Sequence, residues 1–296
     1  MQERYGRGNG PIILVHGGAG HSKTGTPRLK AATKALKAIA TRGVRMLGGQ
    51  RSEVSIVEEL LVLLEQDPQF NAGFGSALQG DGQARLSAAI MSGKVQKFSG
   101  VVLASYLNHP SRLAAHLQGA TSRVLGPPGT ELLARQLGIA VESPQSAARM
   151  EAIAKAYRQK KTGPREFDTV GVVVVGKGGV LAAGTSTGGR GMEFPGRISD
   201  SATVAGNYAS RYAGVSATGT GEEIVDDALA ARIETRCRDG LTLEGACERS
   251  FNEARARKRS YGWIAAGPES DWAVCHTTPG MAYAVIDSKG KLLTFS

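Results

Sequence analysis

The sequence predicts an α+β fold in which antiparallel sheets are covered by helices. Glycine makes up 40 of the 296 residues, about twice its usual share of ~7%, and because the glycines follow no fixed period they indicate turns rather than a fibre. Strand patterns near the end of the chain follow one another as hairpins, and the helical patterns are grouped apart from them. The hydrophobic content of 41% is typical of a globular protein.

The first half of the chain alternates strand and helix patterns. Residues 11–16 form an apolar run typical of a buried strand. Residues 27–45 have a helical pattern with Pro27 in the first turn, where a backbone N–H is not needed. Residues 52–66 repeat apolar side chains at intervals of three and four before Asp-Pro ends the helix. We also expect strands near 84–90 and 100–105, helices near 111–117, 129–137 and 147–161, and a turn-rich loop at 70–82.

A charged stretch broken by Gly-Pro, residues 159–166, is expected to be an exposed, flexible linker. After it, two strands at 169–175 and 180–184 are joined by a glycine-rich hairpin turn. A helix of about 16 residues is expected to begin at Glu222. The remaining expected elements are a loop at 188–196, a strand at 212–217, a helix at 243–257 and strands at 263–266, 272–276, 281–286 and 292–295.

Charge and composition exclude several classes of partner. The net charge is +10, and residues 1–168 carry 22 Lys or Arg against 12 Asp or Glu, whereas residues 169–296 carry 14 of each. These basic residues are scattered and only 5% of residues are aromatic, so we expect no nucleic-acid platform. The apolar runs fall short of the ~18 residues of a membrane span, and no signal peptide is expected. Cys237, Cys247 and Cys275 lie in no C-x-x-C pattern, which favours a cytoplasmic setting without disulfides or zinc.

Two familiar motifs lack the context that their chemistry needs. Gly17–Thr24 approach the phosphate-binding pattern G-x-x-x-x-G-K-[ST], but Ser22 replaces the glycine before the lysine. A nucleotide-binding or non-catalytic protein that uses this loop remains the alternative to an enzyme. Residues 184–188 form a G-x-S-x-G pattern, but the following segment, rich in glycine and containing Pro195, cannot form the helix of a serine-hydrolase elbow.

Thr169 begins a strand directly after the expected linker. A threonine with a free α-amine can catalyse its own reactions, because an amine of pKa ~7.7–8.0 can take the hydroxyl proton. This chemistry requires cleavage of the chain between Asp168 and Thr169. The hydroxyl would attack the carbonyl of Asp168, the amide would become an ester, and water would release the new amine.

Six segments, each common by itself, occur together in a specific order and spacing: residues 16–20 (HGGAG), 70–75 (FNAGFG), 169–171 (TVG), 184–189 (GTSTGG), 195–201 (PGRISDS) and 217–222 (ATGTGE). In these segments the chain resembles the plant-type asparaginase and isoaspartyl aminopeptidase family of N-terminal nucleophile hydrolases. The resemblance covers nearly the whole chain. It implies a four-layer αββα sandwich and a precursor that cleaves itself into an α chain, 1–168, with a linker at about 150–168, and a β chain, 169–296.

The resemblance also implies catalytic roles. Thr169 would be the nucleophile, and Thr187 would orient its hydroxyl. The Thr218 side chain and the Gly219 N–H would form the oxyanion hole, and their place before an expected helix suits negative charge. The structural alternative is a capping box from Thr220 to Glu223, which is compatible with this role.

The same resemblance implies a set of substrate-binding residues. Arg197 would grip the α-carboxylate, because its planar fork matches that group, and Asp200 would bind the α-ammonium, with Gly221 beside them. On spacing alone, a cation and an anion three residues apart can also form a surface ion pair, but the surrounding motif favours substrate binding. Backbone carbonyls would bind a structural sodium ion, and otherwise no cofactor is expected; the carbonyls are those of Leu64, Glu65, Asp67, Phe70, Ala72 and Phe74.

Two departures leave the subfamily open. Ser87 and Ser92 stand in a strand segment where the family usually carries acidic residues, and Asp168 replaces the glycine that usually precedes the nucleophile in isoaspartyl peptidases. An aspartate directly before the nucleophile, as at Asp168, is more similar to the sequence of glycosylasparaginases. The expected substrates are β-aspartyl dipeptides and L-asparagine, with a glycosylasparaginase as the alternative and a dimer of αβ units as the expected assembly.

Overall fold

The computed structural model describes residues 1–20, 25–139, 147, 150–151, 154–155 and 169–296. The linker expected at 159–166, Asp168 and most of the helix expected at 147–161 lie outside these residues. The described chain contains both helices and sheets, and the predicted α+β class is confirmed.

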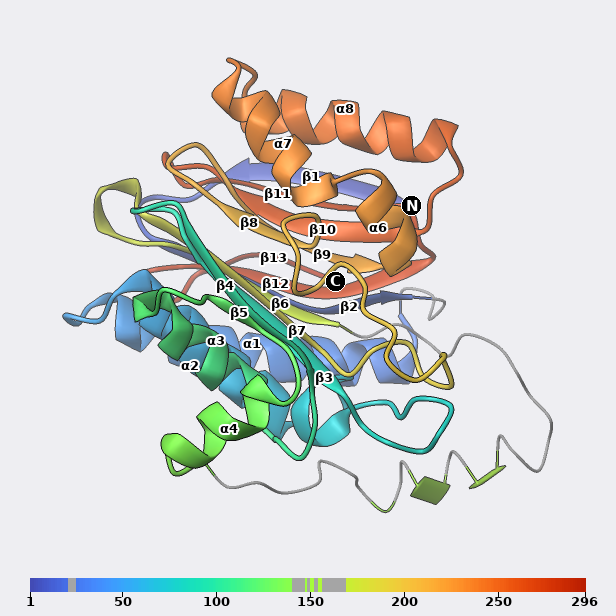
Figure 1. Cartoon of the computed structure of the whole chain (residues 1–296). Helices are drawn as coiled ribbons and strands as arrows, with labels where there is room; N and C mark the ends of the chain where they lie inside the picture. The colour runs from blue at the N-terminus through green and yellow to red at the C-terminus, as the bar shows by residue number, and fades with distance from the viewer. Residues whose placement is uncertain (21–24, 140–146, 148–149, 152–153, 156–168) are drawn as a thin grey trace.

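Two antiparallel sheets form the centre of the molecule (Figure 1). The larger sheet has the order β13-β12-β2-β6-β7-β3-β4-β5, and only its β4–β5 edge is parallel. The smaller sheet has the order β1-β11-β10-β9-β8. The strands are β1 (Gln2–Arg7), β2 (Ile12–Gly20), β3 (Leu86–Ser92), β4 (Lys97–Ala104), β5 (Val124–Leu125), β6 (Val170–Val175), β7 (Leu181–Thr187), β8 (Asn207–Ala209), β9 (Gly214–Gly219), β10 (Tyr261–Ala266), β11 (Asp271–His276), β12 (Gly280–Asp287) and β13 (Leu292–Phe295).

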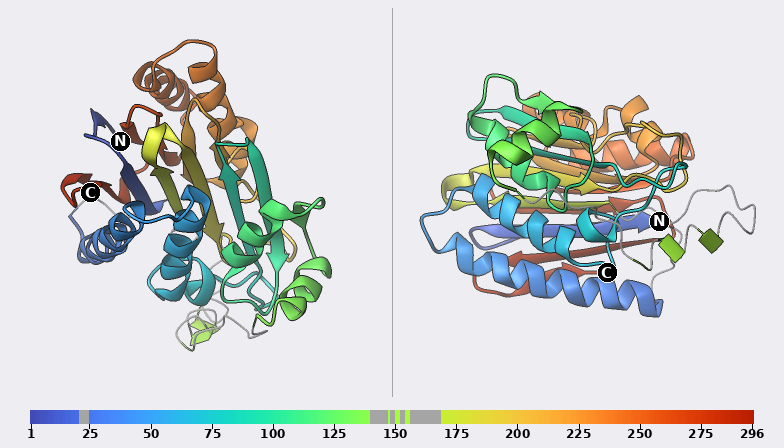
Figure 2. Two further views of the ribbon diagram at one scale, coloured as in Figure 1. Left: turned by 90° about the vertical axis from the view of Figure 1, so that its left-hand side faces the viewer. Right: turned by 60° about the horizontal axis from the view of Figure 1, so that its bottom comes forward.

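The helices cover the sheets, as the two turned views in Figure 2 show. In the larger sheet, α1 packs on β2 and β12, α2 packs on β6 and β7, and α3 packs on β3 and β4. In the smaller sheet, α7 packs on β8 and β9, and α8 packs on β11. The helices are α1 (Pro27–Leu47), α2 (Glu53–Gln66), α3 (Pro110–His116), α4 (Gly129–Gln136), α6 (Gly221–Asp226), α7 (Leu229–Arg238) and α8 (Leu243–Ala256), with short 3₁₀ turns η1 (Gly73–Gly75), η2 (Leu117–Gly119) and η3 (Lys177–Gly179).

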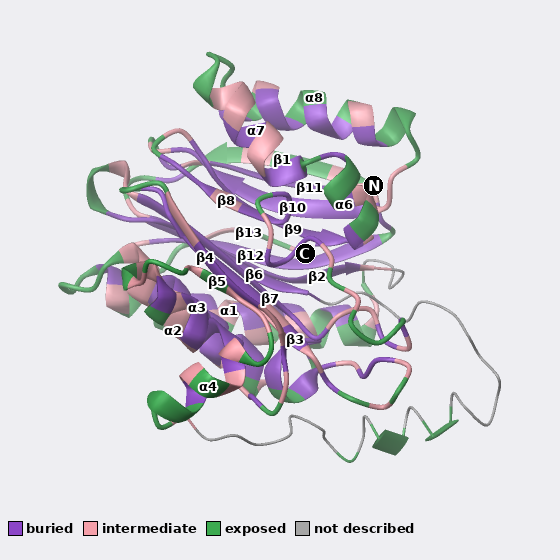
Figure 3. Ribbon diagram, in the orientation of Figure 1, coloured by how far each residue is buried: buried purple, intermediate pink, exposed green. Residues whose placement is uncertain are grey.

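The apolar core occupies the spaces between these elements. One cluster joins α1 and α2 to the larger sheet, a second joins α7 and α8 to the smaller sheet, and a third lies where the sheets face each other, around Ile264 and Tyr283. Burial follows this arrangement in Figure 3, where the central strands are buried and the helices expose one side. Among the described helices, none combines the length and the apolar character needed to cross a membrane.

Local sequence signals explain the helix starts. Thr26 and Ser52 cap α1 and α2, and the side-chain oxygen of each accepts a hydrogen bond from the backbone N–H three residues later. Such caps satisfy N–H groups that have no partner within the helix. The predicted helices at 27–45 and 52–66 are therefore confirmed, with ends that differ by two residues or fewer.

The prediction of one helix of about 16 residues from Glu222 is wrong. The chain forms α6 and then α7, separated by Ala228 in a left-handed conformation with φ 45°. At the start of α7, the N–H of Ala230 donates to the carbonyl of Ala205 at 2.8 Å, so a neighbouring loop supplies its partner. This tertiary bond overrides a helical pattern that is continuous in the sequence.

Candidate active site

Two buried threonine hydroxyls meet where β6 begins and β7 ends. Thr169 Oγ1 donates to Thr187 Oγ1 at 3.1 Å, and the two residues are 8% and 5% exposed. The N–H of Gly189 also donates to Thr187 Oγ1, at 3.1 Å. Thr187 Oγ1 therefore accepts two hydrogen bonds, one from the Thr169 hydroxyl and one from the backbone N–H of Gly189.

A buried polar network lies between the sheets next to this pair. Ser216 Oγ on β9 contacts His16 Nε2 at 3.0 Å and Thr185 Oγ1 at 2.7 Å. Gly171 lies between these partners, because a Cβ at this position would overlap both Ser216 Oγ and His16 Nε2. Burial lowers the pKa of His16 to about 3. A hydrogen bond with the backbone of Thr169 acts in the opposite direction but is the smaller effect. His16 is therefore neutral at physiological pH, and the hydrogen bonds that join β2, β7 and β9 at this point are made by uncharged side chains.

Arg197 lies in the loop after β7 and is paired with Glu222 on α6. Its Nε donates to Glu222 Oε1 at 2.6 Å, and its Nη2 donates to Glu222 Oε2 at 2.8 Å. Burial disfavours the charge of Arg197, but the hydrogen bonds and charge of Glu222 outweigh it and raise the arginine pKa. The same contact lowers the pKa of Glu222 to about 2, so both groups are charged at neutral pH.

Asp200 is a buried carboxylate with a free oxygen. Asp200 is 4% exposed, and its Oδ2 has no hydrogen-bond partner among the described residues. Burial raises the pKa of Asp200 to about 6, although hydrogen bonds from its own backbone N–H and from Ser199, and then the charge of Arg197, oppose the shift. A Cβ on Gly221 would lie 2.7 Å from Asp200 Oδ1, so this position on α6 requires glycine. The Oδ2 atom of Asp200 can therefore accept a hydrogen bond from a cationic group.

The last two residues of β9, which directly precede the N-cap of α6, are those expected to form an oxyanion hole. Thr218 Oγ1 is buried and accepts a hydrogen bond from the N–H of Ala19 at 3.4 Å, and among the described residues its own hydrogen has no acceptor. Gly219 has φ 134°, and a Cβ there would lie 2.5 Å from the Cα of Tyr261. Only glycine fits this close approach.

The expected capping box is wrong. Thr220 is the N-cap of α6, but its side chain makes no cap hydrogen bond. The Glu223 carboxylate instead accepts from the N–H of Ser260 at 2.6 Å, which ties α6 to the residue before β10. With only six residues, α6 also offers a weaker dipole than the long helix that the sequence predicts.

The segment expected to bind sodium comprises the last turn of α2 and the loop that follows it. A Cβ on Gly73 would collide with the carbonyl oxygen of Glu65, and one on Gly75 would collide with that of Phe70. The glycines thus leave room for carbonyl oxygens to gather, which fits a hard cation that prefers oxygen ligands. Among the described residues, no group of three or more His, Cys, Asp or Glu side chains could hold a metal ion.

Several important side chains have no role in the sequence motifs. Glu65 is fully buried and accepts from Ser186 Oγ at 2.7 Å and from Ser111 Oγ at 2.8 Å, which joins α2, β7 and α3. Gln79 accepts from the N–H of Gly196 at 2.9 Å, next to Arg197. These partners lie more than 40 residues away in the sequence, so a local pattern offers no signal for them.

Two groups of expected site residues thus form. One contains Thr169 and Thr187, and the other contains Arg197, Asp200 and Gly221. The strand β9 connects the two groups. Its residue Ser216 packs against Gly171 on β6, and the chain then continues through Thr218 and Gly219 to Gly221 at the start of α6.

The alternative motifs have a different structural context. Gly17, Gly18 and Gly20 belong to β2, which pairs with β12, rather than to a loop that leads into a helix. His21–Thr24 lie outside the described residues. Ser186 is buried and bonded to Glu65, and β7 leads into a loop, so it is not a serine-hydrolase elbow.

Comparisons with known proteins find similar sequences over most of the chain. A sequence model of the asparaginase family matches residues 9–294. The chain is 41% identical to the isoaspartyl peptidase/L-asparaginase of Nostoc sp., over 86% of this chain and 85% of the relative. It is 39% identical to the protein of the same name from Synechocystis sp., over 91% and 85%. It is 36% identical to the isoaspartyl peptidase of Escherichia coli, over 91% of each chain.

Proposed function

The chain belongs to the asparaginase family, and on that premise we propose an autoprocessing threonine hydrolase that cleaves side-chain amides of aspartyl substrates, namely β-aspartyl dipeptides and L-asparagine. The observation that carries this proposal is the buried pair of hydroxyls, Thr169 and Thr187, at 3.1 Å. A threonine at the start of a strand, with its hydroxyl oriented by a second hydroxyl, suits a nucleophile whose base is its own amine.

The first reaction is cleavage of the precursor. Thr169 Oγ1 attacks the Asp168 carbonyl and the C–N bond breaks, so the amide becomes an ester and the α-amine of Thr169 becomes free. Water then hydrolyses the ester, which releases the carboxyl group of Asp168 and regenerates the Thr169 hydroxyl. In each later turnover this amine takes the hydroxyl proton while Oγ1 attacks the side-chain carbonyl of the substrate. The amine leaving group departs with a proton, and water hydrolyses the acyl-threonine ester to release aspartate.

The remaining residues bind the charges of the substrate. Arg197 holds the α-carboxylate, and Asp200, with its free Oδ2, accepts the α-ammonium. The hydroxyl of Thr218 and the N–H of Gly219 donate to the oxyanion that forms at the attacked carbonyl. The partnership of Thr218 with Ala19 supports this role, because it fixes the oxygen and leaves the hydrogen free.

The proposal includes a sodium ion of structural rather than catalytic function. It would be held by the backbone carbonyls of Leu64, Glu65, Asp67, Phe70, Ala72 and Phe74. The room left by Gly73 and Gly75 beside two of these carbonyls supports the assignment. When bound, such an ion would neutralise carbonyl dipoles that point toward one another and stiffen the loop after α2.

We also propose that the fold is the four-layer αββα sandwich of N-terminal nucleophile hydrolases, and that two αβ units form a dimer. Packing of α1 and α2 on one sheet and of α7 and α8 on the other supports this architecture. The free thiols of Cys237, Cys247 and Cys275 support a reducing, cytoplasmic setting.

The decisive test is processing followed by assay. Purified protein should yield a second chain that begins at Thr169 when it is analysed by mass spectrometry. Thr169→Ala should remain one chain of 30.9 kDa and should be inactive. The processed enzyme should hydrolyse β-Asp-Leu and L-asparagine in preference to glycosylated asparagine. A fully active protein that stays intact would refute the mechanism, and a preference for glycosylated asparagine would identify the other subfamily.

A further inference from the structure

The guanidinium of Arg197 has one edge in use and one edge free. Glu222 takes the Nε–Nη2 edge through two hydrogen bonds of 2.6 and 2.8 Å. Among the described residues, no hydrogen bond is formed by Nη1 of Arg197. A guanidinium has five N–H donors in a rigid plane, so a second carboxylate can bind in the same plane through Nη1 and Nη2.

Glu222 itself is fixed by the anchoring of α6. The neighbouring Glu223 accepts from the N–H of Ser260 at 2.6 Å. At the other end of α6, Asp226 accepts from Arg259 Nη2 at 3.2 Å. The helix is therefore tied at two points to the segment that leads into β10.

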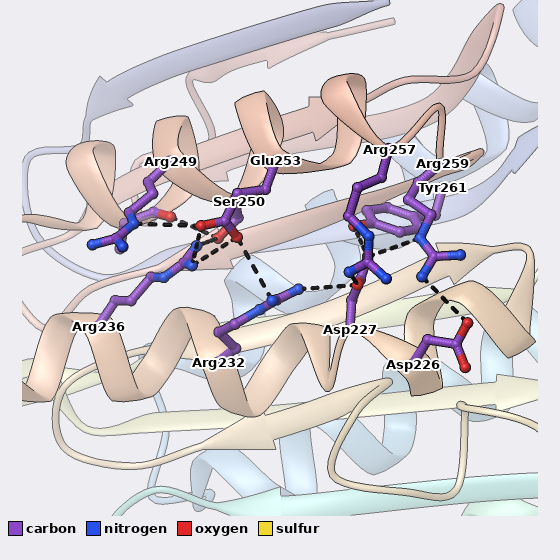
Figure 4. Close-up of polar contacts among 11 residues, drawn as sticks. Asp226, Asp227, Arg232, Arg236, Arg249, Ser250, Glu253, Arg257, Arg259 and Tyr261 are labelled. Atoms are coloured by element: carbon purple, nitrogen blue, oxygen red, sulfur yellow. Dashed lines mark hydrogen bonds and ion pairs between the residues drawn. The ribbon is translucent and has the colours of Figure 1, made fainter.

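The C-cap of α6 belongs to a larger ion cluster (Figure 4). Asp227 has a side chain that is 1% exposed, and it accepts from Tyr261 Oη at 2.7 Å. Arg232, Arg257 and Arg259 surround the same carboxylate, and Figure 4 shows them converging on it from α7 and from the segment between α8 and β10. Such a network holds α6, and Glu222 with it, to the rigid part of the smaller sheet.

We propose that Glu222 is a positioning residue: it holds the side chain of Arg197 so that the free Nη1–Nη2 edge receives the α-carboxylate of the substrate. This inference rests on the proposed function for the identity of the ligand. Without Glu222, the long side chain of Arg197 would explore several rotamers, and substrate binding would have to restrict them.

The opposite role for Glu222 would be that of a competitor. Glu222 carries a negative charge next to Arg197, so it could occupy the arginine in place of the substrate. The geometry favours positioning, because Glu222 uses only one edge and leaves two coplanar donor groups for a second carboxylate. The two roles predict effects of opposite sign on substrate affinity.

The test measures L-aspartate affinity by calorimetry and L-asparagine kinetics, with processed full-length enzyme. Glu222→Gln removes the charge and one acceptor, while Glu222→Asp keeps the charge but is too short to reach both nitrogens in the same way. We expect each variant to raise the Kd for L-aspartate and the KM for L-asparagine about tenfold, with kcat within threefold of wild type. Glu248→Gln on α8 is the matched control, because it removes the same charge from an exposed position and should change neither constant.

Three outcomes would overturn the inference: tighter binding of L-aspartate by Glu222→Gln, wild-type affinity in Glu222→Asp, or a loss of kcat with unchanged Kd. The wild-type enzyme separates this inference from the proposed function. If it binds L-aspartate but hydrolyses no aspartyl amide, the proposed function fails while the effect of Glu222 on affinity can still hold. If it hydrolyses the substrates and either variant gives one of the three outcomes, only the role of Glu222 fails.

Discussion

At the scale of single residues, the buried charge of Asp200, which the proposed substrate binding needs, lowers the stability of the folded state. Its folded-state pKa of about 6 lies above the ordinary value of 3.8, because burial disfavours the charged form. The folded state therefore holds the proton more tightly than the unfolded state. This carboxyl favours folding below about pH 4, and the advantage is lost as pH rises through 6.

Asp200→Asn should accordingly stabilise the protein at pH 8 and abolish substrate binding. A pKa change of this size corresponds to a gain of about 3 kcal/mol in the free energy of unfolding, at ~1.4 kcal/mol per pKa unit. At about pH 3, below the ordinary pKa of 3.8, Asp200 is mostly protonated in both the folded and the unfolded state, so the gain should nearly vanish. Urea denaturation of both proteins at the two pH values measures the difference. An equal gain at both values would show that the buried charge is not its cause.

Thr218 and Thr220 are separated by one residue but should respond differently to loss of the hydroxyl. Thr218→Ala removes an oxyanion donor, so kcat should fall roughly 10²-fold. Thr220→Ala should change the free energy of unfolding by less than about 0.5 kcal/mol, because the Thr220 side chain makes no cap hydrogen bond. Rates should be compared on chains that mass spectrometry shows to be processed. Normal turnover by Thr218→Ala would place the oxyanion hole elsewhere.

At the scale of elements, the spacing between β6 and β9 depends on a missing side chain. Gly171 lies between His16 and Thr185 in the larger sheet, with Ser216 of the smaller sheet above it. An added Cβ would overlap two atoms of this network, and both belong to buried side chains. The sheets would have to move apart locally, two residues from Thr169, the proposed nucleophile.

Gly171→Ala should therefore lower the free energy of unfolding by about 1–3 kcal/mol, as overpacking does in other cores, and should slow the appearance of the second chain. Chemical denaturation and a time course by mass spectrometry measure the two effects. Gly48→Ala is the control, because a Cβ at the end of α1 would meet nothing within 4 Å and the φ of −76° suits alanine. If both variants unfold and process alike, the close contact at Gly171 has no mechanical role.

At the scale of the whole molecule, the two expected chains are interleaved. In the larger sheet, β6 and β7 from the second segment lie between β2 and β3 from the first. Also, β1 from the first segment forms the edge of the smaller sheet beside β11. Separation of the segments would break strand pairings in both sheets, so the proposed cleavage between Asp168 and Thr169 would leave the two chains associated.

The processed protein should therefore elute as one species under native conditions and separate into two chains only in denaturant. Size-exclusion chromatography with light scattering should give about twice 30.9 kDa if two αβ units associate as proposed. Elution of the two fragments as separate peaks would contradict the interleaved arrangement, and a mass of 30.9 kDa would contradict the dimer alone.

Short-range patterns were sufficient for much of the fold and for the motif positions of the site. The caps and the apolar spacing of α1 and α2, and the glycine-rich turn between β6 and β7, are confirmed because they depend on hydrogen bonds and side chains within a few residues of one another. The family motifs likewise located Thr169 and Thr187, which do contact each other.

Contacts between distant residues were decided only by the tertiary structure. The break between α6 and α7 requires a carbonyl from another loop, and β1, which the sequence left without an element, is a strand because β11 supplies its partners. The partners of Arg197 and Ser186 are Glu222 and Glu65, which lie 25 and 121 residues away in the sequence. No local pattern encodes such pairs, because they form only when the packing of the sheets and helices brings the side chains together.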